Sequence, residues 1–421
     1  MRVLIKIIIF IIVLVVIGTA VYLIFFTRDT PRPITTNSPE NGEGLPIAPN
    51  RVFEPQASSS NPLSPLEGGY QSPSELLARL GVNDFSSQSL VGAILMPAVS
   101  TSSEPFIIFL GKNQPGVYAQ NLSSREAKKI GDLNSSQINR VIWLNEPRGL
   151  RLFAEYYDNK EQTLKLRSGL VVNNTGTSTE SMFEESEPPA TIGKFRDLTA
   201  SPDKKQIFYF EETPTEVRGV ISDLEFKKKS IVFSSPFRSW QATWPHQDAI
   251  LLNTRASGLA PGAIYLLDLK KRLNTKILGN KNGLVGKINS KLSVLAYSET
   301  LNNLPRLTFW NVKEAKNLGP TLSTLADKCV WSTETIIYCA VPQTLPAGDY
   351  PDAWYRGEVS FNDDLWKIDI ETGETKRLRI SGDLSDRFDA ENLFLNSDSS
   401  TLFLTNRFNS RLMAFDLKES L

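Results

Sequence analysis

A repeat of short β-type runs constrains the fold of this 421-residue chain more than any other feature. In the clearest run, aliphatic and aromatic residues lead to an Asp or Asn that is followed by another aliphatic residue. Copies of this run stand at residues 117–122, 220–224, 264–269, 307–312, 365–370 and 412–417, with a degenerate copy at 163–170. Self-similarity at a period of about 40 to 50 residues predicts a fold built from one repeated unit.

A second apolar run precedes each of these copies, and a first run precedes the second. The second runs begin at Phe106, Leu150, Gln206, Ala249, Leu292, Thr335 and Thr401. With a fourth short run after the third, each unit supplies four strands separated by polar turns. Seven units of about 47 residues each are the pattern of a seven-bladed β-propeller. We therefore predict an all-β fold with seven four-stranded blades.

One turn carries a family resemblance. The segment Ser201-Pro202-Asp203-Lys204-Lys205, with the strand that starts at Gln206, resembles the S-P-D-G-x-x-I-x-Y core of the WD-like repeats in TolB-type propellers. Segments 331–338 and 365–373 are similar to the same core. The S-P-D turn is intact only here, and Lys204 takes the place of its glycine. The resemblance implies a propeller with a binding or scaffolding role, often outside the cytoplasm, and it implies no particular ligand.

The seventh unit is short of one strand, because only residues 418–421 follow its third run. An open sheet edge is an aggregation hazard, and closing the ring removes it. We predict that a strand from before Leu90 pairs with the last blade.

Residues 7–26 form an uncharged, strongly apolar stretch. As a helix, a stretch of this length spans about 30 Å, the thickness of the hydrocarbon layer of a membrane. Arg2 and Lys6 precede it, which favours a cytoplasmic N-terminus. A cleaved signal peptide is the alternative, but the apolar run exceeds the length that signal sequences use. We predict an uncleaved single-pass membrane anchor within residues 1–27, with the C-terminal domain outside the cytoplasm in a bacterial cell envelope.

Residues 28–72 are rich in Pro, Ser, Asn and Gly and have no apolar period. Such a segment cannot bury enough apolar surface to offset its ordering entropy, so we expect a disordered linker. Residues 74–80 favour a short helix that ends at Gly81. The predicted organisation is therefore an anchor (1–27), a linker (28–72) and a propeller (73–421).

Charge and composition argue against several classes of function. Lys plus Arg equals Asp plus Glu, 46 each, so we expect no electrostatic attraction to nucleic acid. His246 is the sole histidine and has no motif partner, which argues against His-based metal sites and catalytic triads. We expect a monomer with no metal, no cofactor and no enzymatic activity.

The richest candidate site is the long loop at residues 342–364 in the sixth unit. Long loops on a rigid frame commonly carry binding groups. The candidate binding residues are Asp349, Tyr350, Asp352, Trp354, Tyr355, Arg356 and Phe361. Aromatic residues with arginine are typical of protein interfaces, and aromatic residues with carboxylates can also hold a sugar. The alternative is that the aromatic side chains pack the loop onto its own blade. No D-x-D-x-D-G spacing supports calcium.

Two smaller sets of residues have structural interpretations. Cys329 and Cys339 flank a predicted hairpin and fall opposite or nearly opposite on adjacent strands. An oxidising compartment would allow a disulfide, and two buried thiols are the alternative.

The recurring acidic residues at the ends of third runs are expected to cap the following turns, not to form a carboxylate cluster. They are Asp223, Asp268, Asp369 and Asp416.

Together these features favour a non-enzymatic, membrane-tethered propeller that recognises a protein or an envelope polymer through one loop face. The alternative is a carbohydrate-active hydrolase or lyase on the same frame. That activity requires carboxylates that converge at one mouth of the central channel, and the sequence shows none with recognisable spacing.

Overall fold

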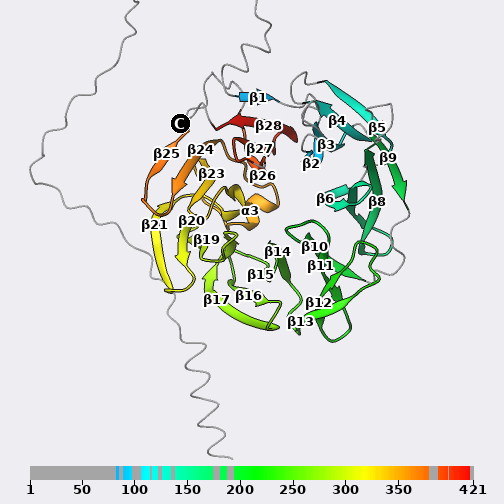
Figure 1. Ribbon diagram of the computed structural model, residues 1–421. Coiled ribbons are helices and arrows are strands. Elements are labelled where there is room, and N and C mark those ends of the chain that lie inside the picture. The colour runs from blue at the N-terminus through cyan, green and yellow to red at the C-terminus, as the bar shows by residue number, and fades with distance from the viewer. Residues whose placement is uncertain are drawn as a thin grey trace, which may run out of the picture. The chain divides into compact units, whose positions relative to one another are not determined.

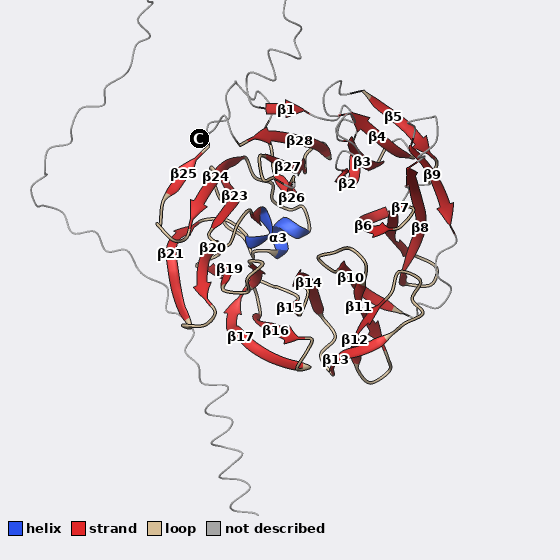
Figure 2. Cartoon of the chain, in the orientation of Figure 1, coloured by secondary structure: helices blue, strands red, loops and turns tan. Residues whose placement is uncertain are grey.

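The computed structural model is a seven-bladed β-propeller, which confirms the predicted architecture (Figures 1 and 2). The structure describes residues 82–84, 89–96, 106–113, 116–121, 126–133, 138–173, 181–186, 194–378, 387–396 and 398–417. The predicted anchor, the linker and the short helix at 74–80 lie outside these residues. Within the described part of the chain, no helix is long and apolar enough to cross a membrane.

The first three blades follow one another in chain order, each with its strands numbered from the centre of the ring outward. Blade 1 consists of β2 (Leu90–Met96), β3 (Phe106–Gly111), β4 (Val117–Asn121) and β5 (Ala127–Gly131). Blade 2 consists of β6 (Ile138–Glu146), β7 (Gly149–Asp158), β8 (Thr163–Asn173) and β9 (Ser181–Ser186). Blade 3 consists of β10 (Phe195–Ala200), β11 (Ile207–Glu212), β12 (Val217–Ser222) and β13 (Ser230–Ser235).

The next three blades repeat the same order. Blade 4 consists of β14 (Trp240–His246), β15 (Ala249–Thr254), β16 (Pro261–Asp268) and β17 (Leu273–Asn282). Blade 5 consists of β18 (Val285–Ile288), β19 (Val294–Leu301), β20 (Leu304–Asn311) and β21 (Lys316–Leu322). Blade 6 consists of β22 (Cys329–Trp331), β23 (Ile336–Pro342), β24 (Asp363–Asp369) and β25 (Thr375–Arg377), and the 3-10 helix η1 (Ala326–Lys328) precedes it.

Blade 7 closes the ring with strands from both ends of the propeller. It contains β26 (Ala390–Leu395), β27 (Thr401–Asn406) and β28 (Arg411–Asp416), and its outermost strand is β1 (Val82–Asp84). β1 pairs antiparallel with β28, with Val82 opposite Phe415 and Asp84 opposite Met413. The prediction that a strand from before Leu90 completes the last blade is therefore confirmed.

The apolar core is divided among the boundaries between blades. Seven buried clusters each join neighbouring blades, and an eighth lies under the long loop of blade 6. The second strand of a blade is buried on both sides, as in β3 and β15, because it lies between two neighbours. The outermost strand β5 is largely exposed. This difference explains why the second runs are continuously apolar in the sequence and the fourth runs are weak.

The two faces of the ring carry different loops. One face, here called the loop face, holds the connections between second and third strands and those from each outermost strand to the next blade. The strap described below and the β27–β28 turn both belong to it. Val82 lies opposite Phe415, at the far end of β28 from that turn, so β1 enters the propeller at the opposite face.

Removal of residues 1–88 should expose the edge of β28 and destabilise the propeller. Loss of three cross-strand pairs is expected to lower the free energy of unfolding by about 1–3 kcal/mol, and the free edge should promote association. Urea unfolding and light scattering measure both effects against a control that lacks only residues 1–68. Equal stability and equal monomer content in the two variants would show that β1 does not close the ring.

Candidate functional site

The long loop of blade 6 crosses the middle of the loop face. It occupies residues 343–362, between β23 and β24, and is called the strap below. It carries the short helix α3 (Asp352–Tyr355), which lies near the centre of the ring in Figures 1 and 2. The strap therefore covers part of the hub and does not extend into solvent.

Hydrogen bonds attach the strap to blades 4 and 5. The backbone N–H of Gly258 donates to Asp352 Oδ2 at 2.6 Å, and Thr300 Oγ1 donates to the carbonyl of Tyr350 at 2.5 Å. The backbone N–H of Gly348 donates to the carbonyl of Asn303 at 3.2 Å. These contacts come from loops of two different blades, so they hold the strap in one position over the ring.

Two glycines allow the strap to approach this closely. A Cβ atom at Gly258 would lie 2.8 Å from the carbonyl oxygen of Tyr350, and one at Gly283 would lie 2.5 Å from the same oxygen. Gly283 also has a positive φ of 64°, which favours glycine. Any side chain at these positions would push the strap off blades 4 and 5.

The aromatic residues of the strap point inward. Tyr350, Trp354 and Phe361 are 0%, 4% and 1% exposed, and they form a cluster with Leu325. Because these three side chains are buried, none of them presents a surface to a partner in this structure. The alternative from the sequence, in which the aromatic side chains pack the loop onto the propeller, describes them.

The remaining candidate residues of the strap also make internal contacts. The Tyr355 hydroxyl donates to Asp327, and Asp352 accepts from Gly258. Arg356 is exposed, but Glu358 accepts from its guanidinium at 2.6 and 2.9 Å. Asp349 is partly exposed and its carbonyl accepts from Ala353. The strap is thus built mainly for attachment to the ring.

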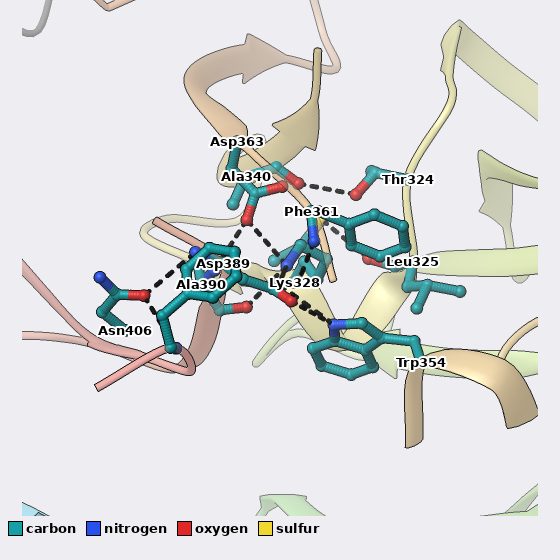
Figure 3. A network of polar contacts seen from close by, with 12 residues as sticks. Thr324, Leu325, Lys328, Ala340, Trp354, Phe361, Asp363, Asp389, Ala390 and Asn406 are labelled. Atoms are coloured by element: carbon teal, nitrogen blue, oxygen red, sulfur yellow. Dashed lines mark hydrogen bonds and ion pairs between the residues drawn. The ribbon is translucent and has the colours of Figure 1, made fainter. Parts of the chain in front are cut away.

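A buried charged cluster lies beneath the strap (Figure 3). Lys328, at the end of η1, has no solvent exposure, and its Nζ lies 2.8 Å from Asp363 Oδ2 and also pairs with Asp389. It donates a further hydrogen bond to the carbonyl of Ala390 at 2.9 Å. The ammonium group lies 4.9 Å from the ring centre of Trp354 and 5.1 Å from that of Phe361.

The two carboxylates accept further hydrogen bonds from the strap and from blade 7. Asp389 accepts from Trp354 Nε1 at 3.0 Å and from the backbone N–H of Phe361 at 3.1 Å. Asp363 Oδ2 accepts from the backbone N–H of Ala390 at 2.7 Å. The cluster, called the Lys328 cluster below, therefore joins the start of blade 6, the strap and the start of blade 7.

One oxygen of this cluster is left without a partner. Asp363 Oδ1 is buried and accepts no hydrogen bond from any described residue. Burial raises the pKa of Asp363 to about 6, although the charge of Lys328 and the N–H of Ala390 act in the opposite direction. With one lysine between two aspartates, protonation of Asp363 makes the cluster neutral.

The cysteine pair lies directly beside this cluster. Cys329 follows Lys328 and is directly opposite Cys339 on β23, and the two are joined by a disulfide. The bond ties the innermost strand of blade 6 to the strand from which the strap departs.

The acidic residues at the strand ends have the structural role that the sequence predicts. The carboxylates of Asp223, Asp268 and Asp369 accept from the backbone N–H groups of Lys227, Lys271 and Glu371 in the turns that follow. His246 is engaged similarly, since its Nδ1 accepts from the N–H of Asp248 at 3.1 Å. Among the described residues, no group of three or more His, Cys, Asp or Glu side chains could hold a metal ion.

The part of the hub away from the strap is hollow. A cavity of about 620 Å³ is lined by the inner strands of blades 7, 1, 2 and 3 together with Trp244. A second space of about 500 Å³ shares several of its lining residues and extends toward the loop face. These two spaces form the open half of the central channel.

Arg140 lines the channel and is paired with two carboxylates. Arg140 donates to both carboxylate oxygens of Glu155, at 2.8 and 2.9 Å, and to Asp197 Oδ1 at 2.8 Å. Asp197 Oδ2 in turn accepts from the backbone N–H of Ala242 at 2.7 Å. This network links blades 2, 3 and 4.

Sequence reasoning missed the centre of the site. Lys328 and Asp389 were not among the candidate residues, although a buried lysine directly before an inner strand is unusual. Asp389 lies 61 residues from Lys328, so no local spacing could have paired them.

Comparisons with known proteins bear on the fold. No protein-family model matches the chain, and no curated protein does. An oligogalacturonate lyase from Vibrio parahaemolyticus is 11% identical over 80% of this chain and 100% of that chain, with a TM-score of 0.46. TolB from Acinetobacter baumannii is 12% identical over 77% of this chain and 78% of that chain, with a TM-score of 0.38.

Larger enzymes also contain a similar region. An acylaminoacyl peptidase is 11% identical over 63% of this chain, with a TM-score of 0.41. The chain spans 42% of the length of that peptidase and 39% of the length of the tricorn protease. At this identity and these TM-scores the similarities transfer no family, activity or partner to this chain.

Asp363 should give the propeller a specific pH dependence. The native state holds a proton on Asp363 up to about pH 6, whereas the unfolded chain releases it near pH 4, so this group stabilises the fold at low pH. That contribution should fall as the pH rises through 6, by about 2 to 3 kcal/mol in total.

The measurement is the free energy of unfolding in urea from pH 4.5 to 7.5, for wild type and Asp363→Asn. The wild type should lose stability relative to the variant up to about pH 6 and not beyond. A difference that is constant with pH would contradict the assignment.

Proposed function

We propose that this chain is a non-catalytic binding propeller, tethered to a membrane by residues 7–26, that docks a protein partner on its loop face. The distribution of exposed apolar side chains carries this proposal. Of nine large apolar side chains that are exposed in the described residues, six lie on or beside connections of the loop face. These six are Tyr157, Phe237, Leu259, Leu301, Leu304 and Phe408.

The docking surface is centred on blades 4 and 5, next to the strap. Leu259 is 74% exposed, and Leu301 and Leu304 are 43% and 41% exposed. They lie in the two loops that bond to the strap through Gly258 and Asn303. Apolar side chains on loops held in one conformation bind at a low cost in ordering entropy, which favours their use as interface anchors.

Several observations support a role without catalysis. Four carboxylates near the hub have cationic partners, Asp363 and Asp389 in Lys328 and Glu155 and Asp197 in Arg140, whereas Glu391, which lines the channel, has no ion pair among the described residues. The alternative is a carbohydrate-active hydrolase, which commonly uses a pair of carboxylates that face bound substrate, or a lyase, which needs a base in that position. The arrangement of these four residues favours binding over bond cleavage.

Two features support display outside the cytoplasm. A disulfide such as that between Cys329 and Cys339 persists in oxidising compartments. The apolar stretch at residues 7–26, with Arg2 and Lys6 before it, favours a membrane anchor whose N-terminus lies in the cytoplasm.

The double substitution Leu259→Asp and Leu304→Asp tests the docking surface. Two charges at the centre of an apolar interface should reduce recovery of the partner at least tenfold, because they remain unpaired in the complex. The full chain is cross-linked in its native membrane and purified, and the proteins attached to it are quantified by mass spectrometry.

Leu273→Asp is the matched control, since Leu273 is exposed on a turn between third and fourth strands at the opposite face. The proposal requires that this control retain the partner that the double variant loses. Equal recovery of the partner by the wild type, the double variant and Leu273→Asp would show that the partner binds elsewhere. Depolymerisation of an envelope polysaccharide by the purified chain would contradict the non-catalytic role and support the enzymatic alternative.

A further inference from the structure

A second, smaller site lies where the base of the strap meets blade 7. It is a pocket of about 290 Å³, at the small end of the range of about 300–1,000 Å³ that is usual for ligand sites. Both ends of the strap contribute to it, together with the segment that leads into β26 and the turn between β27 and β28. Its size suits a single ring-shaped ligand.

An aromatic side chain forms one wall of this pocket. Phe408 is 52% exposed at the tip of the β27–β28 turn, and its backbone N–H donates to Asn406 Oδ1 at 3.2 Å. Asn406 Oδ1 also accepts from the backbone N–H of Asp389, so the turn is connected to the Lys328 cluster. The backbone that carries Phe408 is therefore held by hydrogen bonds, and its ring is an exposed apolar surface beside polar groups.

The strap supplies hydroxyl and amide groups opposite that ring. Asn362 Nδ2 donates to Gln343 Oε1 at 2.9 Å, which fixes the orientation of both amides. Thr344 and Ser360 line the same pocket, and neither hydroxyl is bonded to another described residue. Each hydroxyl can both donate and accept, so together they match a ligand that carries several hydroxyl groups.

A cation completes the lining. The Arg387 guanidinium is exposed at the pocket and makes no ion pair within the described part of the chain. The neighbouring carboxylate, Asp364, is already bonded to Arg377 at 2.7 Å and to Gln343 Nε2 at 3.0 Å. An arginine that no carboxylate of the described residues neutralises presents a planar fork suited to a carboxylate of a ligand.

We infer that this pocket binds a sugar unit that bears a carboxylate. The C–H face of a pyranose ring is apolar and stacks on an aromatic side chain, here Phe408, while its hydroxyl groups lie within reach of the strap. Arg387 then receives the carboxylate. Sugar binding here is independent of the protein docking proposed for blades 4 and 5, and either can fail without the other.

The test uses two sugars that differ only in the carboxylate. Binding of methyl β-D-glucuronide and methyl β-D-glucoside to the full chain is measured by saturation-transfer NMR titration. The glucuronide should bind about tenfold more tightly, because a hydrogen-bonded ion pair adds to the stacking contact. Arg387→Ala should make the two sugars equal, and Phe408→Ala should weaken both by about tenfold.

Phe237→Ala and Arg306→Ala are the controls, because both residues are exposed on the loop face outside the pocket. They should leave both titrations unchanged, and thermal unfolding of every variant checks that the fold is retained. Absence of glucuronide binding to the wild type overturns the inference. So does equal binding of the two sugars, or loss of binding in the controls as large as in the pocket variants.

Discussion

The buried charge of Lys328 is the constraint on which the centre of this propeller depends. An ammonium group without solvent exposure is tolerated only when nearby groups replace its hydration, and here two carboxylates, a carbonyl and two aromatic rings do so. These partners come from blade 6, the strap and blade 7. The interactions that neutralise the lysine therefore also fix the strap over the hub and join blades 6 and 7. Blade 7 is itself completed by β1, which comes from the other end of the propeller.

The fixed strap determines which surfaces remain for binding. The aromatic side chains Tyr350, Trp354 and Phe361 of the strap are buried against the ring. The exposed apolar side chains nearby therefore belong to neighbouring loops, such as Leu259 and Leu304. Its two ends meet beside blade 7 and form the polar pocket that contains Arg387 and Phe408. The channel stays open on the side that the strap does not cover, where inner strands of blades 7, 1, 2 and 3 line it. The proposed docking surface thus lies on loops beside the strap, and the proposed sugar pocket lies between the two ends of the strap and blade 7.

The sequence was sufficient for the architecture and insufficient for the site. Seven copies of an apolar run set the number of blades, and the missing fourth strand after residue 417 required a strand such as β1. The capping roles of Asp268 and Asp369 also followed from local sequence, because their partners lie within three residues. Composition alone could not distinguish inward from outward aromatic side chains, so the sequence left open whether Trp354 and Phe361 bind a partner or pack the loop onto the propeller. The pairing of Lys328 with Asp389, and of the strap with Arg387, depends on how distant blades meet around the ring.

Hydrogen exchange of individual amides tests most directly whether the Lys328 cluster holds the strap. The N–H groups of Phe361 and Ala390 donate to Asp389 and Asp363, so in the wild type they should exchange as slowly as amides of the core strand β23. In Lys328→Met, both amides should exchange at least tenfold faster relative to β23, because two carboxylates are left buried without their cation. Fast exchange of these amides in the wild type, at the rate of the exposed β19–β20 turn, would contradict the account. So would slow exchange that Lys328→Met leaves unchanged.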